Sequence, residues 1–271
     1  KSGSMQYGAA ASLAAAAPVL TGWDDALAKE CLETAVRIWE EEHANPTPTP
    51  SRPGGFGPPG GMAAAEEWNA AVQLLIATNG GEPYKKRLVE LFPAVAQRFG
   101  FGGWPAARVL PYMDAAFRKQ VEEAVKSYVA QLDRDLAATP FGVPPSRGGW
   151  GGSGAVIDLG ARMYFLHKAF PEIVGKDYTL RAANYILGTH PASSSSYVSA
   201  VGTSSKLKAY GNNRADNSFI PGGVIPGYVV IKPDFPECID DFGFLWFESE
   251  YVITAASKWI LAANAADALV R

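Results

Sequence analysis

Four carboxylate side chains gather in the segment 240–250, close to the end of the chain. Two carboxyl groups that are buried to different depths can act as a general acid and its electrostatic partner. Apolar and aromatic residues flank Glu250 on both sides, and such surroundings favour the protonated form that a general acid needs. Acidic residues also complement the dipole at the start of a helix, so this structural role stays open. The four residues are Asp240, Asp241, Glu248 and Glu250.

A second polar group occupies the segment 210–217. It combines the amides of Asn212 and Asn213 with the guanidinium of Arg214 and the phenol of Tyr210. All of these groups can hydrogen-bond to the hydroxyl groups of a sugar. The segment therefore predicts a binding loop for a polyhydroxylated ligand, and a solvated loop of the same composition is the alternative.

The chain contains seven tryptophans, while only 19% of its residues are charged. Sugar rings have apolar faces that pack against large aromatic side chains. Trp150 lies among glycines and Trp246 lies beside the acidic group, so both are predicted to belong to a sugar-binding surface. The alternative is that these tryptophans are ordinary core residues.

Several other chemistries lack the residues that they need. His43, His167 and His190 are far apart and show no metal-ligand spacing, so no metal site is predicted. No nucleophile elbow, phosphate-binding loop or dinucleotide fingerprint is present. The net charge of -3 argues against a nucleic-acid partner, and no uncharged apolar stretch of about 18 residues predicts a membrane span.

Helical periodicity covers most of the chain, and loops rich in glycine and proline separate the helices. Asp24 or Asp25 can cap the second helix, Pro18 is expected to end the first, and Pro93 to interrupt or bend the fourth. The segment 45–61 is expected to form a long loop and 224–231 a short strand. Helices are predicted over residues 5–17, 25–42, 62–78, 83–99, 111–138, 154–170, 171–187 and 249–270.

The number of predicted helices indicates the architecture. About eight helices with almost no sheet exclude a four-helix bundle, and paired helices with unequal loops are typical of an α/α toroid. The helices of such a fold are occupied by packing, so the loops carry the functional site. The predicted fold class is therefore all-α, with long loops that form a sugar cleft.

Five short segments share their order and residue pattern with a known family. The segment 23–32 resembles D-x-x-x-A-x-x-C-L, and 140–153 resembles P-Y-G-V-P followed by W-G-S-N. The segment 184–191 resembles D-Y-I-L-G-x-N-P, 196–202 resembles S-Y-V-T-G-F-G, and 247–253 resembles N-E-x-x-I. Together they resemble glycoside hydrolase family 9, the cellulases and related glucosidases built on an (α/α)6 barrel.

The resemblance implies roles for the polar residues described above. Glu250 matches the catalytic acid of the family, and Ser249 replaces the asparagine before it. Where the family has P-H-H-R, this chain has 211–214, and only Arg214 matches. Sugar contacts near the cleavage point are therefore expected to differ from those of a typical cellulase. The residues expected to bind substrate are Tyr210, Asn212, Asn213, Arg214, Trp150, Trp246, Glu248 and Asp241.

The family's catalytic base is an aspartate in a D-A-G-D motif, which this chain does not contain. An inverting glycosidase needs both a protonated acid and a carboxylate that activates water. An (α/α)6 barrel has twelve helices, of which about eight are predicted here. Residues 1–271 are therefore expected to form the C-terminal two thirds of one catalytic domain. The base would come from an N-terminal segment, present as a second chain.

The resemblance implies inverting hydrolysis of β-glycosidic bonds in a glucan-like oligo- or polysaccharide. A carbohydrate-binding protein without turnover on the same barrel is the alternative, and a polysaccharide lyase on a similar toroid is a weaker one. Family members carry structural calcium, but no calcium-binding loop can be assigned here. The resemblance also implies a secreted or periplasmic protein, with no nucleic-acid or membrane partner.

Overall fold

The computed structural model describes residues 2–47, 61–139, 141–145, 151–189, 195–206, 209–210, 217–227 and 246–271. The chain divides into two compact units, Lys1–Val125 and Lys126–Arg271. Among the described residues, every helix is too short or too polar to span a lipid bilayer.

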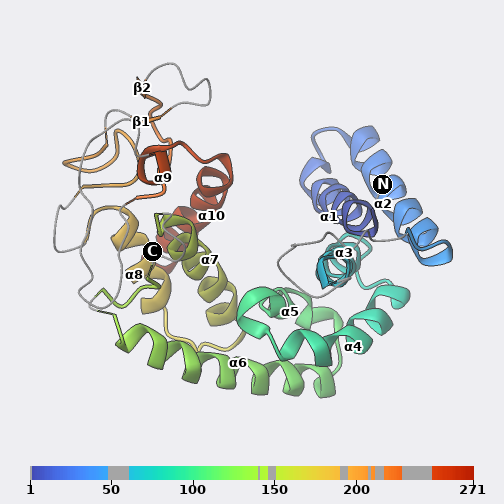
Figure 1. The fold of residues 1–271 in the computed structure, drawn as a ribbon. Helices are drawn as coiled ribbons and strands as arrows, with labels where there is room; N and C mark the ends of the chain where they lie inside the picture. Colours follow the sequence, from blue (N-terminus) through green and yellow to red (C-terminus); the bar gives the residue numbers. More distant parts are fainter. Residues whose placement is uncertain are drawn as a thin grey trace. The chain divides into compact units, whose positions relative to one another are not determined.

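The first unit is built from antiparallel helices (Figure 1). A π-helical turn, Phe99–Gly103, and a 3-10 turn, Leu110–Tyr112, lie on either side of the short helix α5. Helix α6 begins in this unit and continues into the second. The helices are α1 (Gly3–Leu20), α2 (Asp25–Ala44), α3 (Gly61–Ala77), α4 (Glu82–Ala96), α5 (Ala106–Val109) and α6 (Ala115–Ala137).

Helix α1 packs against both α2 and α3 with its small side chains. Its buried face is formed by Tyr7, Ala10, Ala14 and Ala17, and alanines allow the helix backbones to approach closely. The prediction that Pro18 ends this helix is wrong, since Pro18 lies inside α1 and the helix runs to Leu20. Proline has no amide hydrogen, so the helix loses one backbone hydrogen bond at Pro18. The packing of α1 against α2 and α3 compensates for this loss.

Helix α2 starts where the sequence predicts. Asp24 is its N-cap, and the carboxylate of Asp24 accepts a hydrogen bond from the Leu27 amide at 3.0 Å. Asp25 accepts from the amide of Gly22 at 2.8 Å, which fixes the turn between α1 and α2. Gly22 has a φ of 87°, a conformation that favours glycine.

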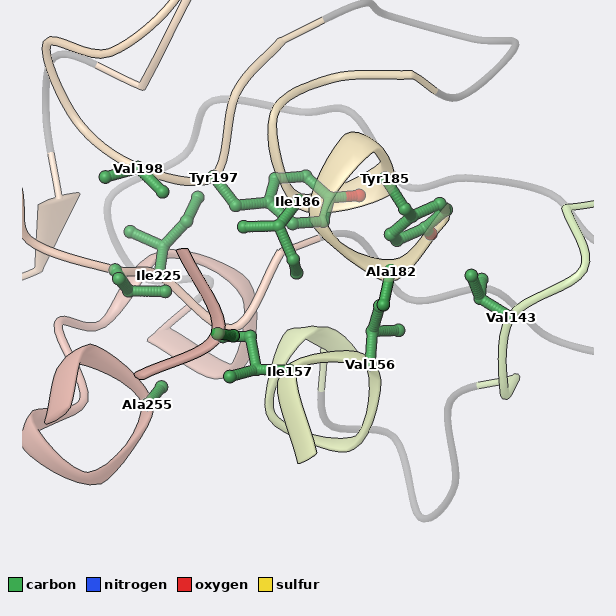
Figure 2. Packing of buried hydrophobic residues seen from close by; sticks show 12 residues of the cluster. Val143, Val156, Ile157, Ala182, Tyr185, Ile186, Tyr197, Val198, Ile225 and Ala255 are labelled. Atoms are coloured by element: carbon green, nitrogen blue, oxygen red, sulfur yellow. The ribbon is translucent and has the colours of Figure 1, made fainter. Parts of the chain in front are cut away.

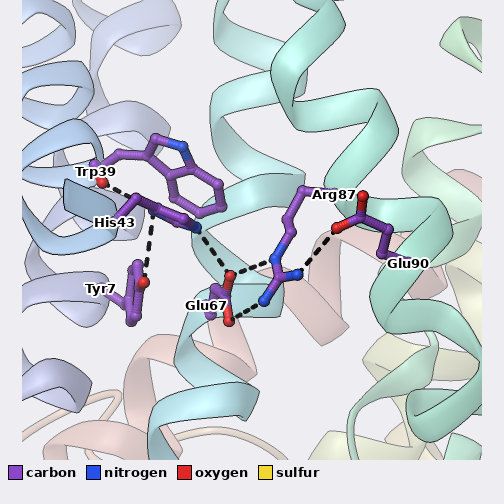
Figure 3. A network of polar contacts seen from close by, with 6 residues as sticks. All are labelled: Tyr7, Trp39, His43, Glu67, Arg87 and Glu90. Atoms are coloured by element: carbon purple, nitrogen blue, oxygen red, sulfur yellow. Dashed lines mark hydrogen bonds and ion pairs between the residues drawn. The ribbon is translucent and has the colours of Figure 1, made fainter. Parts of the chain in front are cut away.

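A polar network joins the helices of the first unit through Glu67, which is 7% exposed (Figure 3). The carboxylate of Glu67 accepts from Nε and Nη2 of Arg87 on α4, at 2.5 and 3.1 Å. His43 on α2 contacts the same carboxylate through Nε2 at 3.0 Å, and its Nδ1 donates to the carbonyl oxygen of Trp39 at 2.9 Å. The bond with Glu67 raises the pKa of Arg87. Glu67 thereby ties α2, α3 and α4 together.

The second unit contains the rest of α6, three long helices and a small hairpin (Figure 1). Strands β1 and β2 are antiparallel, and they pair Ala209 with Ser218 and Tyr210 with Asn217. The elements are α7 (Ser153–Ala169), α8 (Asp177–Ile186), β1 (Ala209–Tyr210), β2 (Asn217–Ser218), α9 (Trp246–Ser249) and α10 (Ile253–Val270).

The core of the second unit lies where α7, α8 and α10 meet two extended segments (Figure 2). Val198 and Val224 form an isolated antiparallel bridge within it. Helices α7 and α8 approach closely at Gly160, where a Cβ atom would lie 3.1 Å from that of Ala182. The core residues are Val143, Val156, Ile157, Ala182, Tyr185, Ile186, Tyr197, Val198, Val224, Ile225, Ala255 and Ala262.

The prediction of an all-α fold with eight long helices is confirmed for the described residues, since α5 and α9 are the short ones. Several helix boundaries differ from the prediction by three residues or more: α1 runs to Leu20, α4 ends at Ala96, α6 starts at Ala115 and α10 starts at Ile253. Helix α8 starts at Asp177 rather than at residue 171, because a turn closed by the carbonyl of Phe170 precedes it. Of the strand predicted over 224–231, Val224 is bridged, while residues 228–231 lie outside the described residues.

Candidate active site

The segment 246–252, which carries Glu248 and Glu250, is fastened to the second unit along its length. The amide of Gly151 donates to the carbonyl of Phe247 at 2.9 Å, and that of Gly227 donates to the carbonyl of Glu248 at 3.1 Å. The amide of Val252 donates to the carbonyl of Val224 at 3.2 Å. These backbone bonds lie on both sides of Glu250, so its position is defined by the core rather than by a free loop.

The two glutamates differ in depth. Glu248 is 2% exposed, whereas Glu250 is partly exposed. Two glutamates that stand two positions apart in the sequence therefore differ in burial. A partly exposed carboxyl group can reach a ligand, and a buried neighbour can influence it electrostatically.

The hairpin of β1 and β2 lies beside the acidic segment, because α9 packs against β1 (Figure 1). The backbone of Tyr210 in β1 is therefore close to the helix that carries Trp246 and Glu248. The pairing of Tyr210 with Asn217 brings together the two ends of the segment 211–216. Asn212, Asn213 and Arg214 belong to that segment and lie outside the described residues, as do Trp150 and Asp241.

Residues 151–153 and 225–227, which bind the acidic segment, also pack closely against each other. The Ser153 hydroxyl donates to the carbonyl of Ile225 at 2.7 Å, and its amide donates to that of Pro226 at 2.8 Å. At Gly151 and Gly227 an added Cβ atom would collide with neighbouring atoms, namely the backbone of 226–227 and the ring of Tyr197. The segment that resembles W-G-S-N is therefore joined to the one that carries Glu250.

Sequence reasoning missed the residues that hold Tyr251, which directly follows Glu250. The Tyr251 hydroxyl contacts Ser199 and the amide of Ile220, both at 3.0 Å. Ser199 lies in the segment that resembles S-Y-V-T-G-F-G, and the pair Gly222–Gly223 marks a tight turn. These signals were present in the sequence, but nothing in it pairs Ser199 with Tyr251.

Metal binding finds no support in the described part of the chain. Within it, no group of three or more histidine, cysteine, aspartate and glutamate residues could hold a metal ion. The calcium that the resemblance allows for has no assigned ligands there.

Comparison with known proteins connects this arrangement to one family. The sequence model described as "Glycosyl hydrolase family 9" matches residues 1–243. Glu250 lies just beyond the matched residues. No match was found among curated proteins.

Solved structures share the fold at low sequence identity. The protein titled "Bacteroides ovatus GH9" is 19% identical with a TM-score of 0.75, and the match covers 100% of this chain and 54% of that one. The cellulase Cel9M of C. cellulolyticum is 16% identical with a TM-score of 0.79, covering 100% and 65%. The catalytic domain of Clostridium thermocellum CelT is 17% identical with a TM-score of 0.73, covering 98% and 61%.

The TM-scores of these matches establish the helical fold. The sequences are too distant to establish more than the fold. The chain matches (α/α)6-barrel catalytic domains and spans between about half and two thirds of the three structures compared.

Proposed function

Because this chain belongs to glycosyl hydrolase family 9, we propose that it contributes the general acid of an inverting β-glycoside hydrolase. The observation that carries this proposal is the acidic segment 246–252, which holds a partly exposed Glu250 between backbone bonds to two core segments. The substrate class is a glucan-like oligo- or polysaccharide. One of the similar structures is titled a metagenome-derived family 9 endoglucanase, at 20% identity.

In the proposed reaction, the Glu250 carboxyl group donates its proton to the glycosidic oxygen as the bond to the anomeric carbon breaks. A water molecule attacks the opposite face of that carbon and gives its proton to a second carboxylate. The product has inverted configuration, and both carboxyl groups then exchange protons with solvent to restore the starting state. We assign the second carboxylate to an aspartate on a segment outside residues 1–271.

The substrate-binding residues complete the proposal. Arg214, Asn212 and Asn213 supply hydrogen bonds to sugar hydroxyl groups from a loop whose ends lie beside α9. Trp150 and Trp246 supply stacking surfaces, while Tyr210, Asp241 and Glu248 complete the set. A substrate of this size is met outside the cell, so we also propose a secreted or periplasmic location.

The test is hydrolysis by the chain together with a segment that carries the D-A-G-D aspartates. Hydrolysis of β-glucans is measured as reducing ends, and the anomer first released is identified by NMR. Glu250→Gln is expected to lower kcat by about 100- to 10,000-fold. Glu172→Gln, a change at an exposed glutamate of the same unit, is the matched control and should leave kcat unaltered. Full activity of Glu250→Gln would refute the assignment.

A second candidate is a sugar-binding protein without turnover. It is favoured by one observation, which is that 211–214 keeps only the arginine of the family's P-H-H-R. Calorimetry that detects oligosaccharide binding by the completed domain, with no product after long incubation, would support this candidate over the hydrolase.

A further inference from the structure

Ser199 is fully buried and forms hydrogen bonds with three parts of the second unit. Its amide donates to the carbonyl of Gly223 at 3.0 Å, and its carbonyl accepts from the amide of Gly222 at 2.8 Å. Its hydroxyl donates to the carbonyl of Lys206 at 2.8 Å. The hydroxyl oxygen also lies 3.0 Å from the Tyr251 hydroxyl. The residue after Glu250 is thus bound to a side chain 52 positions earlier.

The Lys206 carbonyl, at the end of this series of hydrogen bonds, fixes the direction of each bond in it. A carbonyl oxygen can only accept, so the single hydrogen of the Ser199 hydroxyl is committed to Lys206. The Tyr251 hydroxyl must therefore donate to Ser199, and its own oxygen accepts from the amide of Ile220 at 3.0 Å. Each of the two hydroxyl groups thus donates one hydrogen bond and accepts one, and bonds arranged in this way polarise one another.

The tyrosine ring is confined as well as its hydroxyl. A Cβ atom at Gly223 would lie 2.5 Å from the Cε1 atom of Tyr251, so only glycine leaves room for the ring. The next amide along, that of Val252, is bound to the carbonyl of Val224. Tyr251 is therefore fixed by its ring, its hydroxyl and the adjoining backbone.

We infer that Tyr251, held by Ser199, is the positioning residue for the general acid Glu250. The inference rests on the proposed function, because it assigns a role in aiming that acid. The carbonyl of Glu248 is fixed by Gly227 on one side, and Tyr251 is fixed by Ser199 and Ile220 on the other. The backbone that carries Glu250 is thereby fixed on both sides, which restricts where its carboxyl group can meet the glycosidic oxygen, and a small misplacement there is costly in rate.

The test compares Tyr251→Phe, Ser199→Ala and the double variant in the completed catalytic domain. Tyr251→Phe retains the ring against Gly223 and removes only the hydroxyl. On an oligosaccharide, whose leaving group needs a proton, kcat should fall about 10- to 100-fold with KM within about twofold. On a 2,4-dinitrophenyl glycoside, whose leaving group departs unprotonated, kcat should stay within about twofold. The double variant should be no worse than the worse single variant, since both remove one interaction.

The matched control is Tyr178→Phe, which removes a tyrosine hydroxyl bonded to Asp133 elsewhere in the same unit. This variant should match the parent on both substrates. Equal losses on the two substrates by Tyr251→Phe would show a merely structural role and overturn the inference. Unchanged kcat on the oligosaccharide would also overturn it. If Glu250→Gln is fully active, the proposed function itself fails, and this result is distinct from either outcome for Tyr251.

Discussion

Glu67 illustrates how one buried carboxylate can organise several helices. It receives two bonds from Arg87 and one contact from His43, while Arg87 also binds the exposed Glu90 at 3.0 Å. The other ring nitrogen of His43, Nδ1, lies 2.9 Å from the carbonyl oxygen of Trp39. The Glu67 carboxylate thus lies between the guanidinium of Arg87 and the imidazole ring of His43, and its two bonds from Arg87 are charge-assisted.

The Glu67→Gln variant should therefore be less stable. The amide presents one acceptor in place of two and directs its NH2 group at a donor, so buried partners are left unsatisfied. We expect a loss of about 1–3 kcal/mol in the free energy of unfolding, measured by urea denaturation with tryptophan fluorescence. Glu90→Gln is the control, since Glu90 is exposed and its bond contributes less than about 1 kcal/mol. Equal midpoints for the two variants would contradict this account.

Tyr7 gives the first unit a dependence on alkaline pH. Burial, followed by the charge of Glu67, raises the pKa of Tyr7 from 10.0 to about 12. In the unfolded chain the phenol loses its proton first, so stability is present below pH 10 and falls as the pH rises towards 12. Tyr7→Phe should lessen this fall in the thermal midpoint between pH 9 and 12. A fall as steep as that of the parent would show that Tyr7 does not contribute.

At the same scale, the sequence allowed the acids of the site to be recognised but not their supports. Glu248 and Glu250 stand out through the apolar residues around them, and Glu250 also through its match to a family motif. The bond of Tyr251 to Ser199 depends on how two distant segments meet. A pattern of residue types along a chain contains no record of such a meeting.

Among the elements, helices were predictable where a single amphipathic face decides them, as in α2 and α6. The predictions failed where tertiary packing overrides a local signal, as at Pro18 inside α1. They also failed at α8, whose first residues were predicted as helix but form a turn closed by Phe170. The turns and short helix between α4 and α6 were missed, because elements of three to five residues show no period.

The tight glycine contacts of the second unit lead to a prediction about its elements. Gly227 has a φ of 78° and packs on the ring of Tyr197, so Gly227→Ala combines backbone strain with a collision. We expect a loss of about 1–3 kcal/mol in the free energy of unfolding, measured by urea denaturation. Gly154→Ala in α7 is the control, because no atom lies within 4 Å of the added methyl group. That variant should be neutral or up to about 1 kcal/mol more stable.

For the whole molecule, the chain spans about half of several solved family 9 structures. Inversion requires two carboxyl groups on opposite faces of one sugar, and the sequence of residues 1–271 contains no D-A-G-D motif. We therefore expect the chain by itself to bind gluco-oligosaccharides without releasing reducing ends. Addition of the segment with the motif should start the release. Hydrolysis by the chain alone, abolished by Glu250→Gln, would place the base within these residues instead.

The bond from the Ile220 amide to Tyr251 makes that amide a reporter on the segment around Glu250. Ile220 is 50% exposed, so its amide hydrogen would ordinarily exchange quickly with deuterated solvent. Because this amide donates to the Tyr251 hydroxyl, its hydrogen should instead exchange slowly. The rate is that at which the contacts of Tyr251 with Ser199 and Ile220, here called the Tyr251 clamp, open. Tyr251→Phe should return it to fast exchange while leaving the amide of Ile225 protected by the carbonyl of Tyr197. The opening of the clamp can thus be timed in solution without any substrate.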